Sequence, residues 1–179
     1  MVLPAEFVPA LEDSGLILPV GEWVLGEAAR QIGAWQRAGF DPVPVAVNLS
    51  AKQFRRRDLD ALIRAALSDT QVPAGMIELE ITESCLMDEP EEAVRLLAGL
   101  REAGLKISVD DFGTGYSSLS YLTRLPLTAL KIDRSFVRDV ATRTESASIV
   151  RAVIDMNNNW VGGAVFAGIV CSLPLGWLA

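Results

Sequence analysis

The chain has 179 residues, of which 50% are hydrophobic and 22% charged, a composition typical of a globular domain rather than a disordered segment. Its net charge of −7 leaves no basic surplus to neutralise phosphates, which argues against DNA or RNA as a partner. The chain contains no histidine, and this excludes Ser-His-Asp triads, histidine general bases and imidazole metal ligands.

The remaining residue types limit any catalysis to carboxylates, amides, lysine and metal ions. Cys85 and Cys171 have no motif spacing, so they predict neither a zinc site nor a disulfide framework, and they fit a reducing compartment. The first residues lack the basic segment of a signal peptide, and we expect a cytoplasmic protein. The basic run at 55–57 is typical of a solvated helix face.

The first half of the chain alternates helices with strands. Residues 3–15 are expected to form a loop or a short helix, because prolines interrupt them. Apolar residues at helical spacing predict a helix over 21–38. Residues 45–49 are typical of a strand, and Ser50 is placed to cap one helix that extends to Ala66.

The second half continues this alternation. The predicted strands comprise residues 76–82, a stretch from Lys106 that breaks at two adjacent aspartates, and residues 130–133. The predicted helices comprise residues 89–102, 117–124 and 144–156. Alternation of strand and helix favours parallel strands joined by right-handed crossovers, and therefore an α/β fold.

Each predicted strand has one apolar face and one polar face. Residues 76–82 are the clearest case, with isoleucine and leucine on one side and Glu78, Glu80 and Thr82 on the other. Parallel sheets are normally covered on both faces, so a polar face indicates a site, and the mouth of a TIM-type (β/α) barrel is the natural place for one. The polar residues nearest the carboxyl ends of the four strands are Asn48, Glu80, Asp110 and Lys131.

Two carboxylates, Asp110 and Asp111, stand side by side at the end of the third strand. They repel each other unless cations or hydrogen-bond donors compensate them, and hard divalent cations such as Mg²⁺ or Mn²⁺ bind oxygen ligands of this kind. The alternative is an ordinary turn, because aspartate and the glycines that follow favour turns for backbone reasons alone. The polar residues on the other strands favour the site.

Four motifs together resemble the EAL-domain family. They are Val47-Asn-Leu-Ser50, Glu78-Leu-Glu-Ile-Thr-Glu83, Asp110-Asp-Phe-Gly-Thr-Gly115 and Leu130-Lys-Ile-Asp133. Members of this family are cyclic di-GMP phosphodiesterases, which open the cyclic dinucleotide to linear pGpG. The resemblance therefore implies cyclic di-GMP as the ligand and two-metal hydrolysis with Mg²⁺ or Mn²⁺.

The resemblance also implies a role for each polar residue. The implied metal ligands are Asn48, Glu80 and Asp110 for the first ion and Asp111 for the second. Lys131 would help to position the attacking water, and Glu83 would brace the loop at 113–115 rather than touch the metal. Glu78 is expected to be a structural carboxylate that pairs with a neighbouring base.

The chain departs from the family pattern at both ends. The Glu-Ala-Leu motif of the family would precede Leu3, and a further catalytic Glu would fall near Ala167, where this sequence has no match. We therefore expect a partial EAL domain over 1–156, an incomplete TIM-type (β/α) barrel that lacks its first strand and last two strands and is catalytically defective. A non-catalytic cyclic di-GMP-binding or signalling remnant is the alternative.

Residues 157–179 are expected to form a separate apolar tail. Residues 160–179 contain no charged side chain, which meets the minimum of about 20 residues for a membrane span, although glycines and a proline weaken them as a helix. The tail is therefore a frame-shifted or otherwise truncated segment, a membrane anchor, or a buried or disordered extension. In an intact parent protein we expect a homodimer or a fused sensory or diguanylate cyclase domain.

Overall fold

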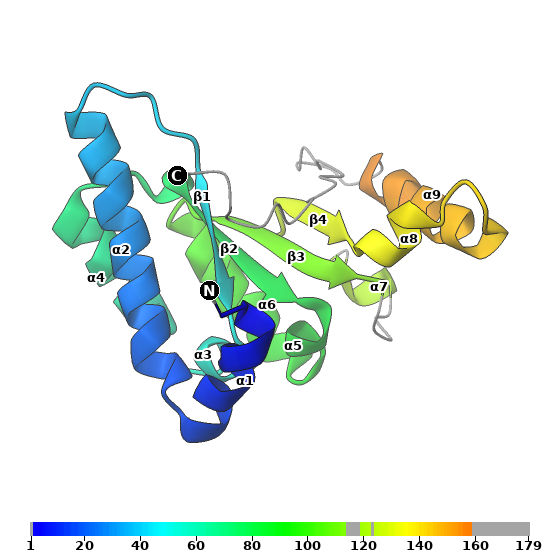
Figure 1. Cartoon of the computed structure of the whole chain (residues 1–179), viewed down its shortest axis with the longest axis horizontal. Helices are drawn as coiled ribbons and strands as arrows, with labels where there is room; N and C mark the ends of the chain where they lie inside the picture. The colour runs from blue at the N-terminus through cyan, green and yellow to red at the C-terminus, as the bar shows by residue number, and fades with distance from the viewer. Residues whose placement is uncertain (1, 114–118, 123, 159–179) are drawn as a thin grey trace.

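The structure is a computed structural model that describes residues 2–113, 119–122 and 124–158 (Figure 1). These residues contain a parallel sheet with the strand order β1-β2-β3-β4. The strands are β1 Val45–Leu49, β2 Ile77–Thr82, β3 Lys106–Phe112 and β4 Ala129–Ile132. Each strand pairs in parallel with the next along the chain, which confirms the α/β fold class. In the described part of the chain, β1 and β4 are the edges of a sheet that does not close.

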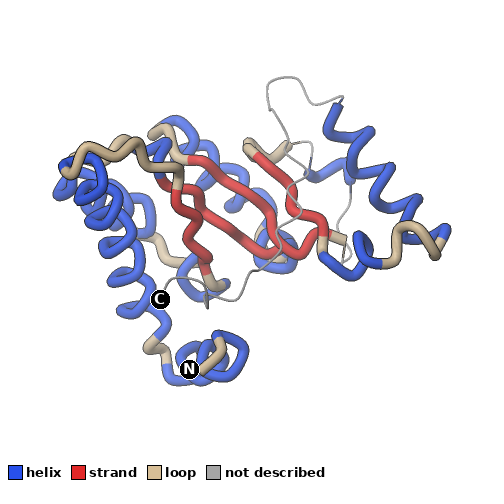
Figure 2. The backbone as a smooth tube through the Cα atoms, turned by 45° about the horizontal axis from the view of Figure 1, so that its top comes forward, coloured by secondary structure: helices blue, strands red, loops and turns tan. Residues whose placement is uncertain are grey.

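Helices precede, connect and follow these strands (Figure 2). The α-helices are α1 Pro4–Ser14, α2 Ile17–Arg37, α3 Ala51–Phe54, α4 Leu59–Thr70, α5 Glu83–Met87, α6 Pro90–Glu102, α7 Leu119–Leu122, α8 Arg134–Arg138 and α9 Thr144–Asn158. A single 3₁₀ turn, η1 Ala74–Met76, leads into β2. Helices α8 and α9 lie together beyond β4 (Figure 1).

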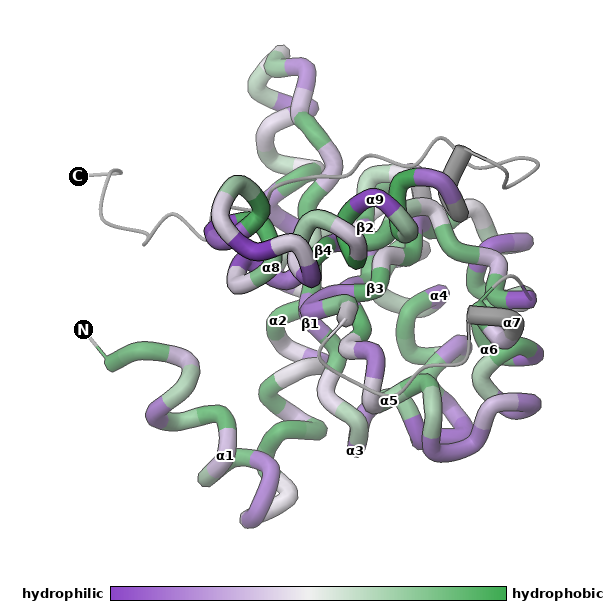
Figure 3. Tube along the Cα trace, turned by 90° about the vertical axis from the view of Figure 1, so that its right-hand side faces the viewer, coloured by the Kyte–Doolittle hydropathy of each residue, from purple (hydrophilic) through white to green (hydrophobic). Residues whose placement is uncertain are grey.

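The core lies between the apolar face of the sheet and three helices. Leu25 of α2, Ile63 of α4 and Leu97 of α6 join strand residues such as Leu79 and Ile107 in one buried cluster. Complete burial of one such side chain stabilises the fold by about 2 kcal/mol, so this cluster fixes the sheet and leaves its other face for polar residues. Helix α1 buries no residue and projects away from the sheet (Figure 3).

The single helix predicted to follow Ser50 is two helices, α3 and α4, so that prediction was wrong. Ser50 does cap α3, because its side chain accepts a hydrogen bond from the backbone N–H of Gln53, and the Gln53 side chain accepts one from the backbone of Ser50. After α3, Arg56 donates to both carboxylate oxygens of Asp58, at 2.8 and 2.7 Å, and also pairs with Glu22 of α2. Residues i and i+2 face apart on a helix, so these contacts require the break.

Two short helices, α5 and α8, were not predicted. Helix α5 follows β2 without a loop, and α8 begins after Asp133, whose carboxylate accepts a hydrogen bond of 2.8 Å from the backbone N–H of Ser135. The residue expected to end the fourth strand therefore caps a helix. Elements of about one turn are too short to show a helical period in the sequence.

The prediction that β3 breaks at its two aspartates was wrong, because the strand continues through Phe112. Val109 pairs with Leu130 and Phe112 with Ile132, so β3 has one residue more than β4 between these pairs. The extra residue makes a β-bulge, in which Asp111 adopts a φ of 53°. Aspartate tolerates this left-handed conformation better than most residues, and bulges re-aim side chains at strand ends.

Helix α9 extends to Asn158, past the expected domain end at Met156. Residues 159–179, which comprise most of the expected tail, lie outside the described residues. Within the ranges given above, none of the helices combines the length and apolar character needed to cross a membrane.

Candidate active site on the polar face of the sheet

The polar residues of the strands share one face of the sheet. The register pairs Asn48 with Glu80 and Glu80 with Ser108, so these three residues form a row across β1, β2 and β3. Neighbouring strands are about 4.8 Å apart, which brings Asn48 and Glu80 side by side. Asp110 pairs with Thr82, one step along this face toward the carboxyl ends of the strands. We call this surface the polar face, and its residues are Asn48, Glu78, Glu80, Ser108, Asp110 and Lys131.

Lys131 reaches across this face from β4 to β2. Its ammonium Nζ contacts Oε1 of Glu80 and lies 3.8 Å from Oε1 of Glu78. The side chain therefore crosses β3, where the fully buried Ser108 is small enough to leave room for it. The side chains of Lys131 and Glu80 are only 11% and 8% exposed. A buried ammonium needs acceptors, and the two glutamates provide them.

Glu78 connects Lys131 to the middle of the sheet. Its Oε1, the oxygen nearest to Lys131, accepts a hydrogen bond of 2.7 Å from Oγ of Ser108. Glu78 thus pairs with a base, as expected, and the base is Lys131. Sequence reasoning did not single out Ser108, although its place between the buried Ile107 and Val109 puts it on the polar face.

Asp110 and Asp111 concentrate negative charge at the end of β3. Oδ1 of Asp110 accepts a hydrogen bond of 3.0 Å from the backbone N–H of Asp111. Burial, followed by the negative charges of Asp110 and Asp133, raises the pKa of Asp111 above its ordinary value. Hydrogen bonds from the hydroxyl and the backbone N–H of Ser135 lower the pKa of Asp133. Carboxylates that repel one another in this way attract a cation.

Glu83 ties the end of β2 to the residue that follows β3. Its side chain is buried, and its Oε2 accepts a hydrogen bond of 2.9 Å from the backbone N–H of Gly113. Gly113 has a φ of 101°, and a Cβ atom there would lie 2.9 Å from the ring of Phe136. The hydrogen bond from Gly113 to Glu83 holds the first residue of the loop that Glu83 is expected to brace, and residues 114–118 lie outside the described ranges.

The donor chemistry of the polar face fits a hard divalent cation. Asn48, Glu80 and Asp110 offer amide and carboxylate oxygens on adjacent strands, and Mg²⁺ and Mn²⁺ prefer such ligands. Among the described residues, however, no group of three or more His, Cys, Asp or Glu side chains is already close enough to hold a metal ion. The ammonium of Lys131 contacts Glu80 instead, so a cation must compete with it.

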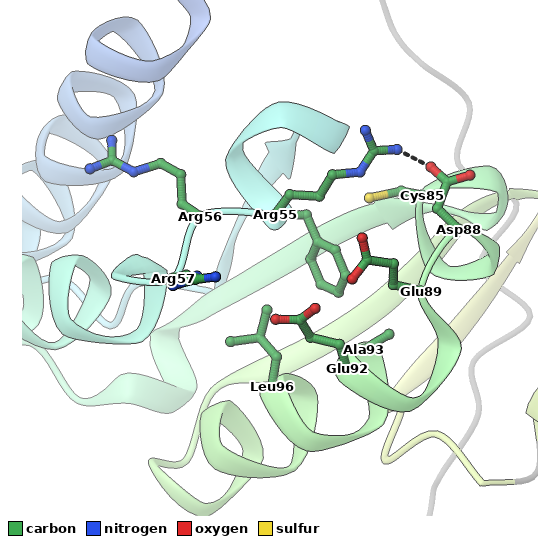
Figure 4. A pocket seen from close by; sticks show the side chains of 10 residues that line it. Arg55, Arg56, Arg57, Cys85, Asp88, Glu89, Glu92, Ala93 and Leu96 are labelled. Atoms are coloured by element: carbon green, nitrogen blue, oxygen red, sulfur yellow. Dashed lines mark hydrogen bonds and ion pairs between the residues drawn. The ribbon is translucent and has the colours of Figure 1, made fainter.

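A cavity of about 290 Å³ lies elsewhere, between the loop after α3 and the start of α6 (Figure 4). Arginines 55–57 line one side and Asp88 and Glu92 the other, with an ion pair between Arg55 and Asp88. Burial raises the pKa of Cys85, which also lines this cavity, to about 11, so the thiol is protonated at neutral pH. The described residues that line it include none from the polar face, so the two sites are separate.

Comparison with known proteins identifies the fold that carries the polar face. The family model of the EAL domain matches residues 1–169. The chain belongs to the EAL-domain family. The match extends past Met156, where the resemblance was expected to end.

Curated relatives of this EAL domain are much longer proteins. The chain is 44% identical over 155 residues to the signaling protein YkoW of Bacillus subtilis, covering 87% of this chain and 19% of that protein. It is 44% identical over 154 residues to MucR of Pseudomonas aeruginosa, a bifunctional diguanylate cyclase/cyclic di-GMP phosphodiesterase, with 86% and 22% covered. It is 38% identical over 154 residues to the cyclic di-GMP phosphodiesterase PdeR of Escherichia coli, with 86% and 23% covered. The chain thus spans about a fifth of the length of these relatives.

Solved EAL domains share this fold. The PaMucR phosphodiesterase in complex with c-di-GMP superposes with a TM-score of 0.85 at 41% identity, covering 92% of this chain and 66% of that chain. The EAL domain of Mycobacterium smegmatis DcpA gives 0.75 at 34% identity, with 82% and 66% covered. The Xanthomonas citri FimX EAL domain in complex with c-diGMP gives 0.78 at 26% identity, with 88% and 62% covered. These likenesses confirm the predicted TIM-type fold class.

Proposed function

We propose that this EAL domain supplies the metal-binding polar face of a cyclic di-GMP phosphodiesterase that hydrolyses its substrate to linear pGpG. The observation that carries the proposal is the row of oxygen donors across adjacent strands, with the ammonium of Lys131 in contact with one of them. Parallel (β/α) barrels place their active sites at the carboxyl ends of the strands, where these donors lie.

Four residues would hold the divalent cations, Mg²⁺ or Mn²⁺. They are Asn48, Glu80 and Asp110 for one ion and Asp111 for the other. Such cations activate water and neutralise the charge that develops on a phosphodiester. Glu80 is well suited as a ligand, because its carboxylate is 8% exposed and lies in register with Asn48. Asp110 and Asp111 are suited because their mutual repulsion falls when a cation binds.

Lys131 and Glu83 would support this site without holding a cation. The ammonium of Lys131 lies on the polar face, where it can orient the attacking water or neutralise a phosphate oxygen. Glu83 fixes Gly113, the residue that follows β3, and so keeps the backbone beside Asp111 in place. Removal of either side chain should slow hydrolysis, because it would displace the catalytic groups, and a displacement near 1 Å costs about 10²-fold in rate.

The relatives support cyclic di-GMP as the substrate. PdeR and MucR are named as cyclic di-GMP phosphodiesterases, and the PaMucR and Xanthomonas citri FimX structures are complexes with this dinucleotide. The bifunctional MucR also supports a longer parent protein with a fused diguanylate cyclase or sensory domain. We also propose that the protein is cytoplasmic and that its EAL domain forms a homodimer.

The isolated 179-residue chain should be a poor catalyst. Its sequence has no match near Ala167 to the further catalytic Glu of the family. Binding of cyclic di-GMP without turnover is therefore the second candidate function. A specific observation favours it, because the ammonium of Lys131 contacts Glu80, one of the proposed metal ligands.

A chimera tests the proposed site in a complete domain. Residues 3–158 would replace the matching segment of the PaMucR EAL domain, and pGpG would be followed by chromatography with Mn²⁺ present. We expect hydrolysis by the chimera and a loss of about 10²-fold or more with Asp110→Ala, since even outer-shell partners of a metal contribute about 10- to 100-fold. The isolated chain should not exceed its own Asp110→Ala variant. Equal rates for the chimera and its Asp110→Ala variant would contradict the assignment of the polar face as the metal site.

A further inference from the structure

Glu80 has two competing partners on the polar face. Its Oε1 contacts the ammonium of Lys131, and the proposed function needs the same carboxylate as a ligand of a divalent cation. An ammonium and a divalent cation repel each other strongly at such short range, so a cation bound at Oε1 of Glu80 displaces the ammonium from that oxygen. Lys131 must therefore leave Glu80 when a cation binds.

A displaced Lys131 needs another acceptor. Its side chain is 11% exposed, and an ammonium that remains buried without a partner is costly. Glu78 precedes Glu80 by two residues on the same face of β2, and its Oε1 is already 3.8 Å from Nζ of Lys131. A charge-assisted hydrogen bond is about 2.8 Å long, so a shift of about 1 Å brings the ammonium onto Glu78.

Ser108 keeps Glu78 ready to accept the ammonium. Its hydroxyl donates the 2.7 Å hydrogen bond to the same oxygen, Oε1, that faces Lys131. Ser108 is fully buried on β3, the strand that lies between Glu78 and Lys131, so this anchor is fixed by the sheet itself. An acceptor held in place by a buried donor loses little conformational freedom when the lysine arrives.

We propose that Glu78, held by Ser108, is a positioning residue that accepts Lys131 when Glu80 binds a divalent cation. The proposal rests on the proposed function, because it presumes a cation at Glu80. Glu78 acts through Lys131: it keeps the ammonium away from the metal-binding carboxylate and retains it on the polar face. One lysine thus has two acceptors, and a bound cation removes one of them.

Binding of Mn²⁺ to the full 179-residue chain tests this without reference to turnover, with free Mn²⁺ followed by electron paramagnetic resonance. Glu78→Gln should weaken Mn²⁺ binding by about tenfold, the lower end of the range for outer-shell partners of a metal. Ser108→Ala leaves the charge of the site unchanged and should weaken binding in the same direction by a smaller factor. Glu102→Gln, at an exposed position at the end of α6, is the charge-matched control and should change nothing.

The decisive comparison uses a background without the ammonium. Lys131→Met alone should tighten Mn²⁺ binding, because Glu80 is then free of its competitor. In that background Ser108→Ala should change Mn²⁺ affinity by less than about twofold, and Glu78→Gln should lower it much less than in the wild-type background. Coupling between two positions appears as such a difference between backgrounds. Glu78→Asp, which keeps the carboxylate, should recover part of the affinity that Glu78→Gln loses.

Equal losses in both backgrounds would overturn the proposal and leave the metal site standing, because Glu78 would then act through its charge alone. Absence of Mn²⁺ binding by the wild-type chain would overturn the metal site, and this proposal with it. Thermal unfolding of each variant controls for folding. If Glu78→Gln unfolds the chain, Ser108→Ala and Glu78→Asp in the two backgrounds give the same comparison.

Discussion

Removal of the Lys131 ammonium should destabilise the fold measurably. Lys131→Met keeps much of the aliphatic side chain but leaves Glu78 and Glu80, which are 22% and 8% exposed, without a base between them. Loss of one partner of a buried ion pair costs about 3–5 kcal/mol, because the remaining charge stays buried without compensation. Since Glu78 keeps some contact with solvent, we expect the lower end of that range, about 3 kcal/mol of the free energy of unfolding.

A second substitution separates lost charge compensation from lost packing. Glu80→Gln removes the carboxylate that contacts the ammonium, so the Lys131→Met/Glu80→Gln double variant should be more stable than Lys131→Met by about 1–2 kcal/mol. Urea unfolding at neutral pH, followed by tryptophan fluorescence, gives each free energy. A Lys131→Met variant within about 0.5 kcal/mol of the wild-type chain would refute the reasoning, because surface substitutions have effects of that size.

Three further features of the fold can be probed by substitution. Gly113→Ala should lower the stability by about 1–2 kcal/mol, because a φ of 101° disfavours an L side chain and the new Cβ would meet Phe136; an unchanged melting temperature would speak against this backbone geometry. Ser50→Ala should cost about 1 kcal/mol in urea unfolding, through loss of the α3 cap, and a stabilised variant would contradict that role. In a Cys171→Ser variant, Cys85 should react slowly with an alkylating agent at neutral pH, because burial raises its pKa to about 11, and rapid labelling would show that it is accessible. This folded-state pKa exceeds the ordinary value of 9.0, so the stability that Cys85 contributes is present below pH 9 and is lost as the pH rises toward about 11. The urea midpoint of the Cys85→Ala variant should therefore fall less over this pH range than that of the wild-type chain.

The sheet and its polar face could be predicted because strand alternation is a local property. In β2 the buried Leu79 and Ile81 flank Glu80, and in β4 Leu130 precedes Lys131, so a period of two is enough to assign the faces. The carboxyl ends of parallel strands lie at one edge of a sheet, so the candidate residues could also be grouped before any coordinates were known.

Contacts between distant elements could not be predicted from such patterns. The reach of Lys131 to Glu80 depends on the strand order and on the small Ser108 between them. The ion pair of Arg56, in the break between α3 and α4, joins this segment to Glu22 on another helix. The β-bulge likewise depends on how β3 registers against β4. Each of these features is set by a partner far away in the sequence.

Anomalous diffraction from Mn²⁺ decides whether the polar face is a metal site. Crystals of the chain soaked in Mn²⁺ would locate the ion independently of any catalytic assay. We expect an anomalous peak at about 2.1 Å from side-chain oxygens of Asn48, Glu80 and Asp110, with the ammonium of Lys131 moved onto Glu78. A peak elsewhere, for example in the cavity of Figure 4, with Lys131 still in contact with Glu80, would contradict the assignment of the polar face as a metal site.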